Sequence, residues 1–247
     1  MRNVQLKKFV AALILGTFAV SAPISSTEGR IHDPKIRAIS STDLRHGAKY
    51  DYNSYNKAYE DYEPAINDFF VPETTSTADS SITGTPIASQ EQCVEYLLRN
   101  NPNPKITVSP EEIVAYYYEE AGREGIRPDV AFAQALKETG FFRYGGDVVP
   151  EQNNFCGLGT TGGGVKGGYF PTAKLGVRAH IQHLLAYSST RRPTMPLVDP
   201  RYELVRNVYG SNTLNTWSDL NGRWAVPGHH YGQEILSMFR AIVATRA

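Results

Sequence analysis

Two consecutive segments with helix start and stop signals constrain the fold of this chain most. Residues 109–112 read Ser-Pro-Glu-Glu, which places an N-cap, a proline at the first helical position and a glutamate at the third. Gly125 should end this helix. The sequence Arg-Pro-Asp at 127–129 begins a second, alanine-rich helix that Gly140 ends. Small side chains allow this second helix to pack closely against its neighbours, so a mainly helical domain is predicted.

Downstream segments support the same fold class. Apolar residues recur at helical spacing over residues 177–185 and again over 235–242. Between the helices, residues 157–168 carry seven glycines, which is typical of a turn-rich excursion or a short β-hairpin. We therefore expect a mainly α (α+β) domain with a small glycine-rich β-hairpin lobe.

The N-terminus has the pattern of an export signal. Arg2, Lys7 and Lys8 precede an apolar run over residues 9–20, and small residues follow up to Ala22. The run is shorter than the roughly 20 residues of a membrane span. Residues 1–22 are therefore predicted to be a signal peptide, and no membrane span is expected after processing. Because Pro23 is unfavourable for cleavage there, the alternatives are cleavage a residue or more to either side and an uncleaved anchor, and in each case the protein is expected outside the cytoplasm.

Residues 23–89 are rich in Ser, Thr, Asp, Pro and Tyr and have no sustained apolar periodicity. This composition predicts a disordered stalk, so residues 90–247 are left as one domain of ordinary size. The stalk should be dispensable for catalysis, and a chain beginning near Gln90 should stay active.

Charge and cysteine content narrow the function further. The chain has 25 basic and 25 acidic residues, so no basic surplus points to nucleic acid. Its two cysteines, Cys93 and Cys156, match an oxidising exterior and could form one disulfide. We expect them to lie close enough for a bridge, although two unpaired buried thiols would explain them almost equally well.

Glu138 is the first candidate for chemistry. It ends the alanine-rich helix and precedes Thr-Gly-Phe-Phe at 139–142. Burial beside aromatic rings would raise the pKa of this carboxyl, as a general acid near neutral pH requires. A glutamate at a helix end is more often a solvated surface charge. The surrounding motifs have to decide between the two.

Residues 133–140 read Ala-Gln-Ala-Leu-Lys-Glu-Thr-Gly, and 152–159 read Gln-Asn-Asn-Phe-Cys-Gly-Leu-Gly. These motifs resemble those of bacterial peptidoglycan endo-β-N-acetylglucosaminidases, which are glycoside hydrolases of family 73 in the lysozyme superfamily. The likeness continues through residues 169–184 and reaches 224–232, so it covers the chain from about Ser109 onward. It implies a lysozyme-like catalytic domain that acts on peptidoglycan glycan strands.

The resemblance also implies roles for single residues. Glu138 matches the family's general acid and Tyr231 its active-site tyrosine, although a tyrosine at a helix start could equally pack on the core. Further candidates for substrate binding are Gln134, Asn154, Phe155, Tyr169 and Trp224. Aromatic residues at the last two positions would stack on sugar rings, but aromatics there are at least as often core.

One departure from the family pattern concerns the second catalytic group. Many relatives place a second carboxylate in the hairpin, yet residues 157–176 contain no Asp or Glu. Asp147 and Glu151 are the nearest carboxylates, and Asp147 is our candidate for activating water. Ordinary solvated charge explains both at least as well, and assistance by the substrate's own N-acetyl group is a third possibility.

Other patterns are weaker. Residues 157–162 spell GxGxxG, but no hydrophobic strand precedes them and no helix follows, so nucleotide binding is not expected. His180 and His183 share a helix face without a carboxylate or cysteine cluster beside them, so no zinc site and no cofactor are expected. Cys156 with either histidine would make a cysteine peptidase, the other chemistry of wall hydrolases, but this is not expected because Cys156 falls inside the turn motif at 152–159.

The sequence therefore predicts a secreted or wall-associated monomer. The resemblance implies that it cleaves the β-1,4 bond after N-acetylglucosamine, with Glu138 protonating the leaving oxygen. A lytic transglycosylase of the same superfamily and a non-catalytic wall-binding module are the alternatives.

Overall fold

The computed structural model describes residues 80–160, 164, 166–225 and 228–247. The predicted signal peptide and most of the predicted stalk lie outside these residues. None of the described helices is long and apolar enough to cross a membrane.

Six α-helices and two short 3₁₀ helices make up the regular structure of the described part. In chain order they are α4 (Gln90–Asn100), α5 (Pro110–Glu124), α6 (Pro128–Thr139), η2 (Pro150–Gln152), α7 (Ala173–Ser188), α8 (Tyr202–Tyr209), η3 (Trp217–Leu220) and α9 (Tyr231–Val243). The mainly helical fold is confirmed, and it is consistent with a lysozyme-like domain.

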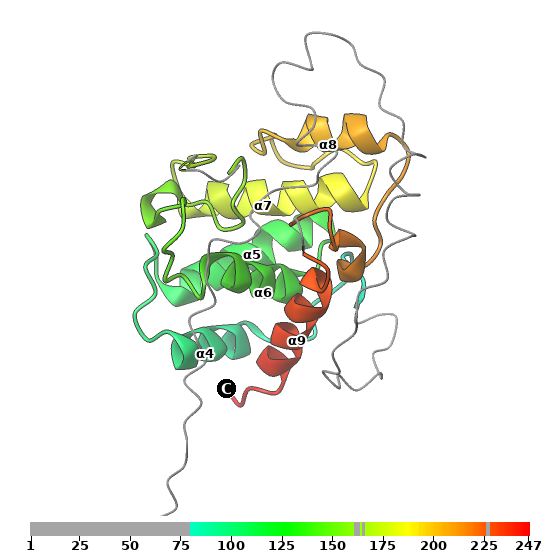
Figure 1. Cartoon of the computed structure of the whole chain (residues 1–247). Coiled ribbons are helices and arrows are strands. Elements are labelled where there is room, and N and C mark those ends of the chain that lie inside the picture. The colour runs from blue at the N-terminus through cyan, green and yellow to red at the C-terminus, as the bar shows by residue number, and fades with distance from the viewer. Residues whose placement is uncertain (1–79, 161–163, 165, 226–227) are drawn as a thin grey trace, which may run out of the picture.

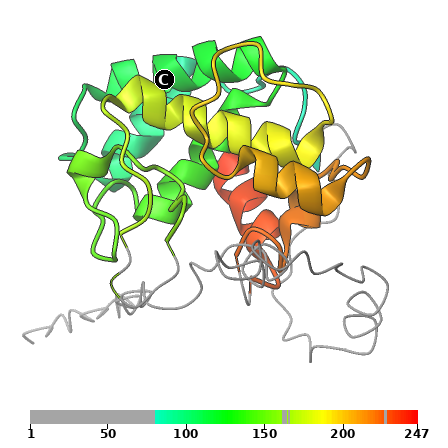
Figure 2. The same cartoon turned by 90° about the horizontal axis from the view of Figure 1, so that it is seen from above.

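The helices stack around α5 and α6. Figure 1 shows α7 and then α8 on one side of this central pair and α4 on the other, and these neighbours are in contact. From above, α9 (red) lies beside the segment that contains η3 (orange) (Figure 2). Side chains with no exposed surface fill the centre, among them Phe132, Leu136, Val177, Ile181, Trp217 and Ile235.

The predicted helix ends are confirmed at α5 and α6. Ser109 accepts from the backbone N–H of Glu112, and the Glu112 carboxylate accepts from the backbone N–H of Ser109, so the capping box is complete. Gly125 and Gly140 follow the two helices in the left-handed conformation, with φ of 66° and 59°.

The predicted hairpin is not confirmed. The described residues contain only isolated β-bridges and no strand. The glycine-rich excursion is instead closed at its base, where the Gly168 N–H donates to the Leu158 carbonyl at 2.7 Å. The Gln152 side chain donates to the carbonyls of Lys166 and Gly168 and so fixes the end of the glycine-rich segment.

Packed structure begins before the predicted boundary at residue 90. Ile82 is fully buried, and its N–H donates to the Asn215 carbonyl at 2.9 Å. The buried carboxylate of Asp129 accepts from the N–H groups of Ile87 and Ala88 at 2.7 and 3.1 Å. Residues 80–89 therefore belong to the folded domain rather than to a stalk.

The expected disulfide is absent, because Cys93 and Cys156 are both buried and both free. The Sγ of Cys93, on α4, lies 3.6 Å from the hydroxyl of Tyr118. Cys156 instead lies in the turn near Glu138, and burial, followed by the charge of Glu138, raises the pKa of its thiol. The two thiols thus occupy different environments, and the interpretation as unpaired buried residues is correct.

Candidate functional site

Glu138 emerges from the most buried helix of the domain. Almost every side chain of α6 before its last turn is inaccessible to solvent, whereas Lys137 and Glu138 are half-buried. Gly140 then turns the backbone sharply, and Phe141, Phe142 and Tyr144 all have φ near +60°. The helix end therefore presents Glu138 from a rigid base, beside a tightly folded turn.

Tyr231, the first residue of α9, is the direct partner of this carboxylate. Its hydroxyl donates a hydrogen bond to Glu138 Oε1. Burial, and next the charge of Glu138, raise the pKa of the Tyr231 hydroxyl well above its usual value. Tyr231 therefore stays neutral and keeps the proton that it donates. Two residues that lie 93 positions apart in the sequence thus meet at one site.

The turn at residues 153–160 faces the other carboxylate oxygen. A β-carbon built at Gly157 would lie 4.0 Å from Glu138 Oε2 and 3.2 Å from Thr160 Oγ1. Gly157 has a φ of 66°, which side chains rarely tolerate. The close approach and the left-handed backbone together explain why a glycine stands next to the carboxylate.

Asn154 holds this turn in shape. Its side-chain N–H donates to the carbonyls of Leu158 and Gly168 at 2.9 and 3.2 Å, and its Oδ1 accepts from the Leu158 N–H at 2.9 Å. The side chain is buried, so both ends of its amide are used inside the protein. The geometry gives Asn154 the role of positioning Gly157 rather than that of contacting a sugar.

The preceding Asn153 joins the turn to α7. Its backbone is left-handed, with φ of 49°, and its side chain donates to the Phe170 carbonyl and accepts from the Thr107 hydroxyl. A β-carbon at Gly176 of α7 would lie only 1.8 Å from the Asn153 carbonyl oxygen. The first turn of α7 therefore lies directly against the turn that carries Gly157.

Gln134 lies one helical turn before Glu138 on α6 and has no exposed surface. Its Nε2 donates to the Tyr231 hydroxyl at 2.8 Å, and its Oε1 lies 2.9 Å from Nε2 of His180. The Nδ1 of His180 in turn lies 2.9 Å from the Tyr117 hydroxyl. Gln134 was predicted to bind substrate, but the structure places its side chain behind Tyr231.

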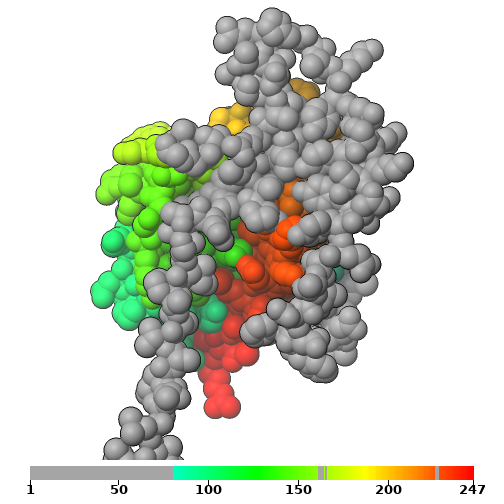
Figure 3. Space-filling model, viewed as in Figure 1, coloured from blue at the N-terminus to red at the C-terminus, as the bar shows by residue number. Residues whose placement is uncertain are grey.

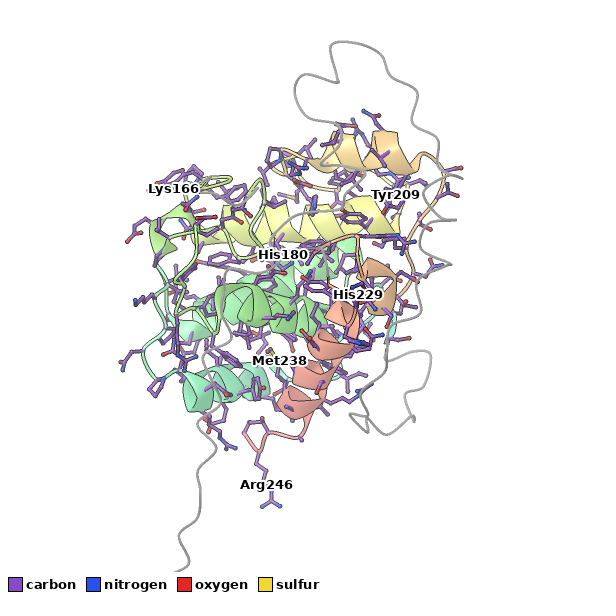
Figure 4. The ribbon with its side chains drawn as sticks, in the orientation of Figure 1. Lys166, His180, Tyr209, His229, Met238 and Arg246 are labelled. Atoms are coloured by element: carbon purple, nitrogen blue, oxygen red, sulfur yellow. The ribbon has the colours of Figure 1, made fainter. Side chains whose placement is uncertain are left out.

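His180 is neutral in this environment. Burial, and next the neighbouring His183, lower its pKa to about 3. It lies at the centre of the domain (Figure 4), with ring contacts to Tyr117 and Trp224. Sequence reasoning considered this histidine only for zinc or thiol chemistry. Its helical spacing signalled a buried face of α7, but not its partners.

The remaining predicted residues lie in different places. Phe155 and Trp224 are buried in the core. The ring centres of Phe155 and Phe142 are 5.8 Å apart in an edge-on contact, and those of Trp224 and His183 are 4.9 Å apart. Tyr169 is 66% exposed. Asp147 is half-buried and Glu151 is exposed. Burial, and next the charge of Glu151, raise the pKa of the Tyr144 hydroxyl. Tyr169 is thus the predicted aromatic that is available to a ligand.

The structure gives no support to thiol or metal chemistry among the described residues. Burial raises the pKa of the Cys156 thiol well above its usual value, the opposite of an activated thiolate. The imidazole of His183 bonds Asp199 at 2.9 Å. In the part of the chain that the structure describes, no group of three or more His, Cys, Asp or Glu side chains is arranged to hold a metal ion.

Figure 3 shows the glycine-rich segment (yellow-green) and α9 (red) on the same face of the molecule. Comparisons with known proteins cover this region. A family model described as Glucosaminidase, mannosyl-glycoprotein endo-beta-N-acetylglucosaminidase, matches residues 114–242. The match includes Glu138, the turn at 153–160 and Tyr231.

A curated protein of Borreliella burgdorferi (strain ATCC 35210 / DSM 4680 / CIP 102532 / B31) is 39% identical over 136 residues and carries the description "Uncharacterized protein". The aligned part is 55% of this chain and 64% of that protein, so the chain spans slightly less than two thirds of the relative. No solved structure matches the chain.

Proposed function

The chain belongs to the glucosaminidase family, and from this premise we propose that it is an exported hydrolase of the glycan strands of peptidoglycan. The bond cleaved is the β-1,4 bond after N-acetylglucosamine, and Glu138 is the general acid. The observation that carries the proposal is the hydrogen bond from Tyr231 to one oxygen of Glu138, with the other oxygen facing the glycine turn.

The two oxygens of Glu138 have different tasks in this mechanism. Oε1 accepts the hydrogen bond from the Tyr231 hydroxyl and therefore carries no proton itself. Oε2 is the oxygen that carries the acid proton and passes it to the leaving glycosidic oxygen as the bond breaks. It lies on the side of Gly157, whose β-carbon, if present, would be 4.0 Å from it.

The second chemical group is the open part of the mechanism. Asp147 and Glu151 are the first carboxylates that follow Glu138 in the chain, and either would activate water in a conventional pair. Participation of the substrate's N-acetyl group requires no second carboxylate. A lytic transglycosylase also requires none, and it would release anhydro-muramic ends instead of reducing N-acetylglucosamine.

Hydrolysis of purified peptidoglycan, with mass spectrometry of the products, tests the proposal. Reducing N-acetylglucosamine ends are expected, whereas anhydro-muramic ends would assign the chain to the transglycosylases. Binding to sacculi without any cleavage would favour a wall-binding module. Asp147→Asn and Glu151→Gln should cause smaller losses than loss of the acid, unless one of them is the base.

Glu138→Gln removes the transferable proton while keeping the shape of the side chain. We expect a loss of about 10²–10⁴-fold in rate, because this is the usual contribution of one general acid. Glu95→Gln makes the same chemical change on α4, where the Glu95 side chain is 42% exposed and paired with Arg99, and it should leave the rate unchanged. Retained activity in Glu138→Gln, with folding intact by circular dichroism, would contradict the assignment of the acid.

A further inference from the structure

A buried row of polar side chains runs from Glu138 into the centre of the domain. Tyr231 bonds Glu138, Gln134 bonds Tyr231, and His180 bonds Gln134. Tyr117 completes the row at His180. The four residues behind Glu138 are between 0 and 3% exposed, and they come from α5, α6, α7 and α9.

Resting on the proposed function, we propose that Gln134, His180 and Tyr117 are positioning residues, which fix Tyr231 as a hydrogen-bond donor to Glu138 Oε1 and so leave the acid proton on Oε2. None of the three touches the substrate. Each acts on the acid through the next residue of the row.

The protonation state of each member makes the row directional. His180 is neutral, so it donates from one ring nitrogen and accepts at the other. Because Gln134 Oε1 can only accept, Nε2 of His180 is the donor and Nδ1 accepts from the Tyr117 hydroxyl. Gln134 Nε2 then donates to the Tyr231 oxygen, and the single Tyr231 proton is directed to Glu138.

Neighbouring groups do not disturb this direction. Burial raises the pKa of Tyr117, Tyr231 and Cys156 well above their usual values, so these groups stay neutral around Glu138. Lys137, whose ammonium lies 5.7 Å from the Tyr231 ring centre, is ion-paired with Glu234, and Asp199 bonds His183. Neither bonds a member of the row in the contacts described above.

The direction matters because a carboxylic acid holds its proton on one oxygen. If the Tyr231 proton pointed elsewhere, Oε1 could hold the acid proton and donate it to Tyr231. That proton would face the protein interior instead of the Gly157 side. Successive hydrogen bonds polarise one another, so a change at Tyr117 should be felt at Glu138.

A double-mutant cycle in the full chain tests this coupling. Tyr117→Phe removes one hydroxyl and should lower kcat about 5-fold with KM unchanged, the equivalent of one ordinary hydrogen bond. Tyr231→Phe should cost more. Because Tyr117 acts through Tyr231, adding Tyr117→Phe to Tyr231→Phe should cause no further loss.

Tyr202→Phe is the matched control. Like Tyr117→Phe it deletes the hydrogen-bonded hydroxyl of a fully buried tyrosine, but Tyr202 lies on α8, outside the row, and its hydroxyl donates to the backbone carbonyl of Arg191. It should lower stability by a similar amount and leave kcat unchanged. If the losses from Tyr117→Phe and Tyr231→Phe multiply independently, or if Tyr202→Phe lowers kcat as much as Tyr117→Phe, the inference is wrong.

A second measurement does not depend on activity. Nitrogen NMR of the imidazole in the full chain should find His180 protonated on Nε2 and not on Nδ1, and the carboxyl titration of Glu138 should move upward in Tyr117→Phe. A proton on Nδ1, or an unchanged Glu138 titration, would overturn the inference. If the wild-type chain cleaves no glycan, the proposed function fails by itself, and these two spectra still decide the positioning role.

Discussion

At the scale of single residues, alanine substitutions at two glycines with the same φ distinguish the effect of backbone strain from an effect on the site. Gly157 and Gly125 both have φ of 66°, but only Gly157 lies beside Glu138. An alanine at either position should cost about 1 kcal/mol of stability through backbone strain.

Only Gly157→Ala should also lower activity on peptidoglycan, because its β-carbon would lie 3.2 Å from Thr160 Oγ1 and in the space before Glu138 Oε2. Denaturant unfolding and turnover measured on both variants make the comparison. Equal activities in the two variants would show that the space beside Gly157 is not used by the substrate.

His180 should make stability depend on pH. Its pKa is lowered to about 3 in the folded protein, against about 6.5 in the unfolded chain. As pH falls from 6.5 towards 3, the unfolded state therefore binds a proton that the folded state refuses, and stability falls. The slope from this one group approaches about 1.4 kcal/mol per pH unit below the unfolded pKa.

Urea unfolding between pH 6.5 and 5 measures this slope before most carboxylates titrate. His180→Gln should reduce the slope by about one proton, whereas His229→Gln, at an exposed position, should change it little. A His180→Gln variant with the wild-type slope would mean that the folded protein protonates His180 normally.

Sequence motifs predicted Glu138 and Tyr231 but not the residues behind them. Tyr117 and His180 are 63 positions apart, and His180 and Gln134 are 46 apart, so no local pattern joins them. A buried polar residue also looks like a surface one in sequence. For the same reason Gln134 was predicted to face the substrate, and aromatic character alone could not distinguish buried Trp224 from exposed Tyr169.

At the scale of elements, the sequence was sufficient to predict helix ends, because these depend on residues within one helical turn. The capping box at Ser109 and the glycines after α5 and α6 lie where their backbone requirements predicted. The glycine-rich segment was ambiguous, because glycine permits a hairpin and an irregular loop alike. Contacts from Gln152 and Asn154 shape this loop, and they lie outside the segment.

The packing of α7 on the site turn gives a prediction for a helical glycine. A β-carbon at Gly176 would meet the Asn153 carbonyl at 1.8 Å, whereas one at Gly122 in α5 would meet nothing within 4 Å. Gly176→Ala should therefore destabilise the protein by about 1–3 kcal/mol, as overpacking does. Gly122→Ala should stabilise it by about 0.5–1 kcal/mol through helix propensity.

The turn that contacts Gly176 of α7 also carries Gly157. Gly176→Ala should therefore also lower the activity per amount of folded protein, whereas Gly122→Ala should not. Thermal unfolding and turnover of the two variants measure both effects. Destabilisation of the same size in both would mean that helix propensity, and not the contact with Asn153, controls position 176.

At the scale of the whole molecule, the segment before α4 joins α5 and the start of α6 to the region around η3. Ile82 pairs with Asn215 on one side and, through its carbonyl, with the Arg127 N–H on the other. The indole N–H of Trp217 donates to the Ser81 carbonyl, and the Tyr118 hydroxyl donates to that of Ala88. No apolar periodicity marks this segment, because its attachment is mostly through backbone groups.

A chain that begins at Ser80 should therefore keep the stability and activity of the domain, whereas one that begins at Gln90 should lose several kcal/mol. Removing residues 80–89 exposes the site of Ile82, and burial of such a side chain alone contributes about 2–5 kcal/mol. It also leaves the buried Asp129 carboxylate without the N–H groups of Ile87 and Ala88. Ile82→Ala in the chain that begins at Ser80 should lose part of the same free energy of unfolding, as measured by urea unfolding. Equal unfolding midpoints for the chains that begin at Ser80 and at Gln90 would instead place the domain boundary at residue 90.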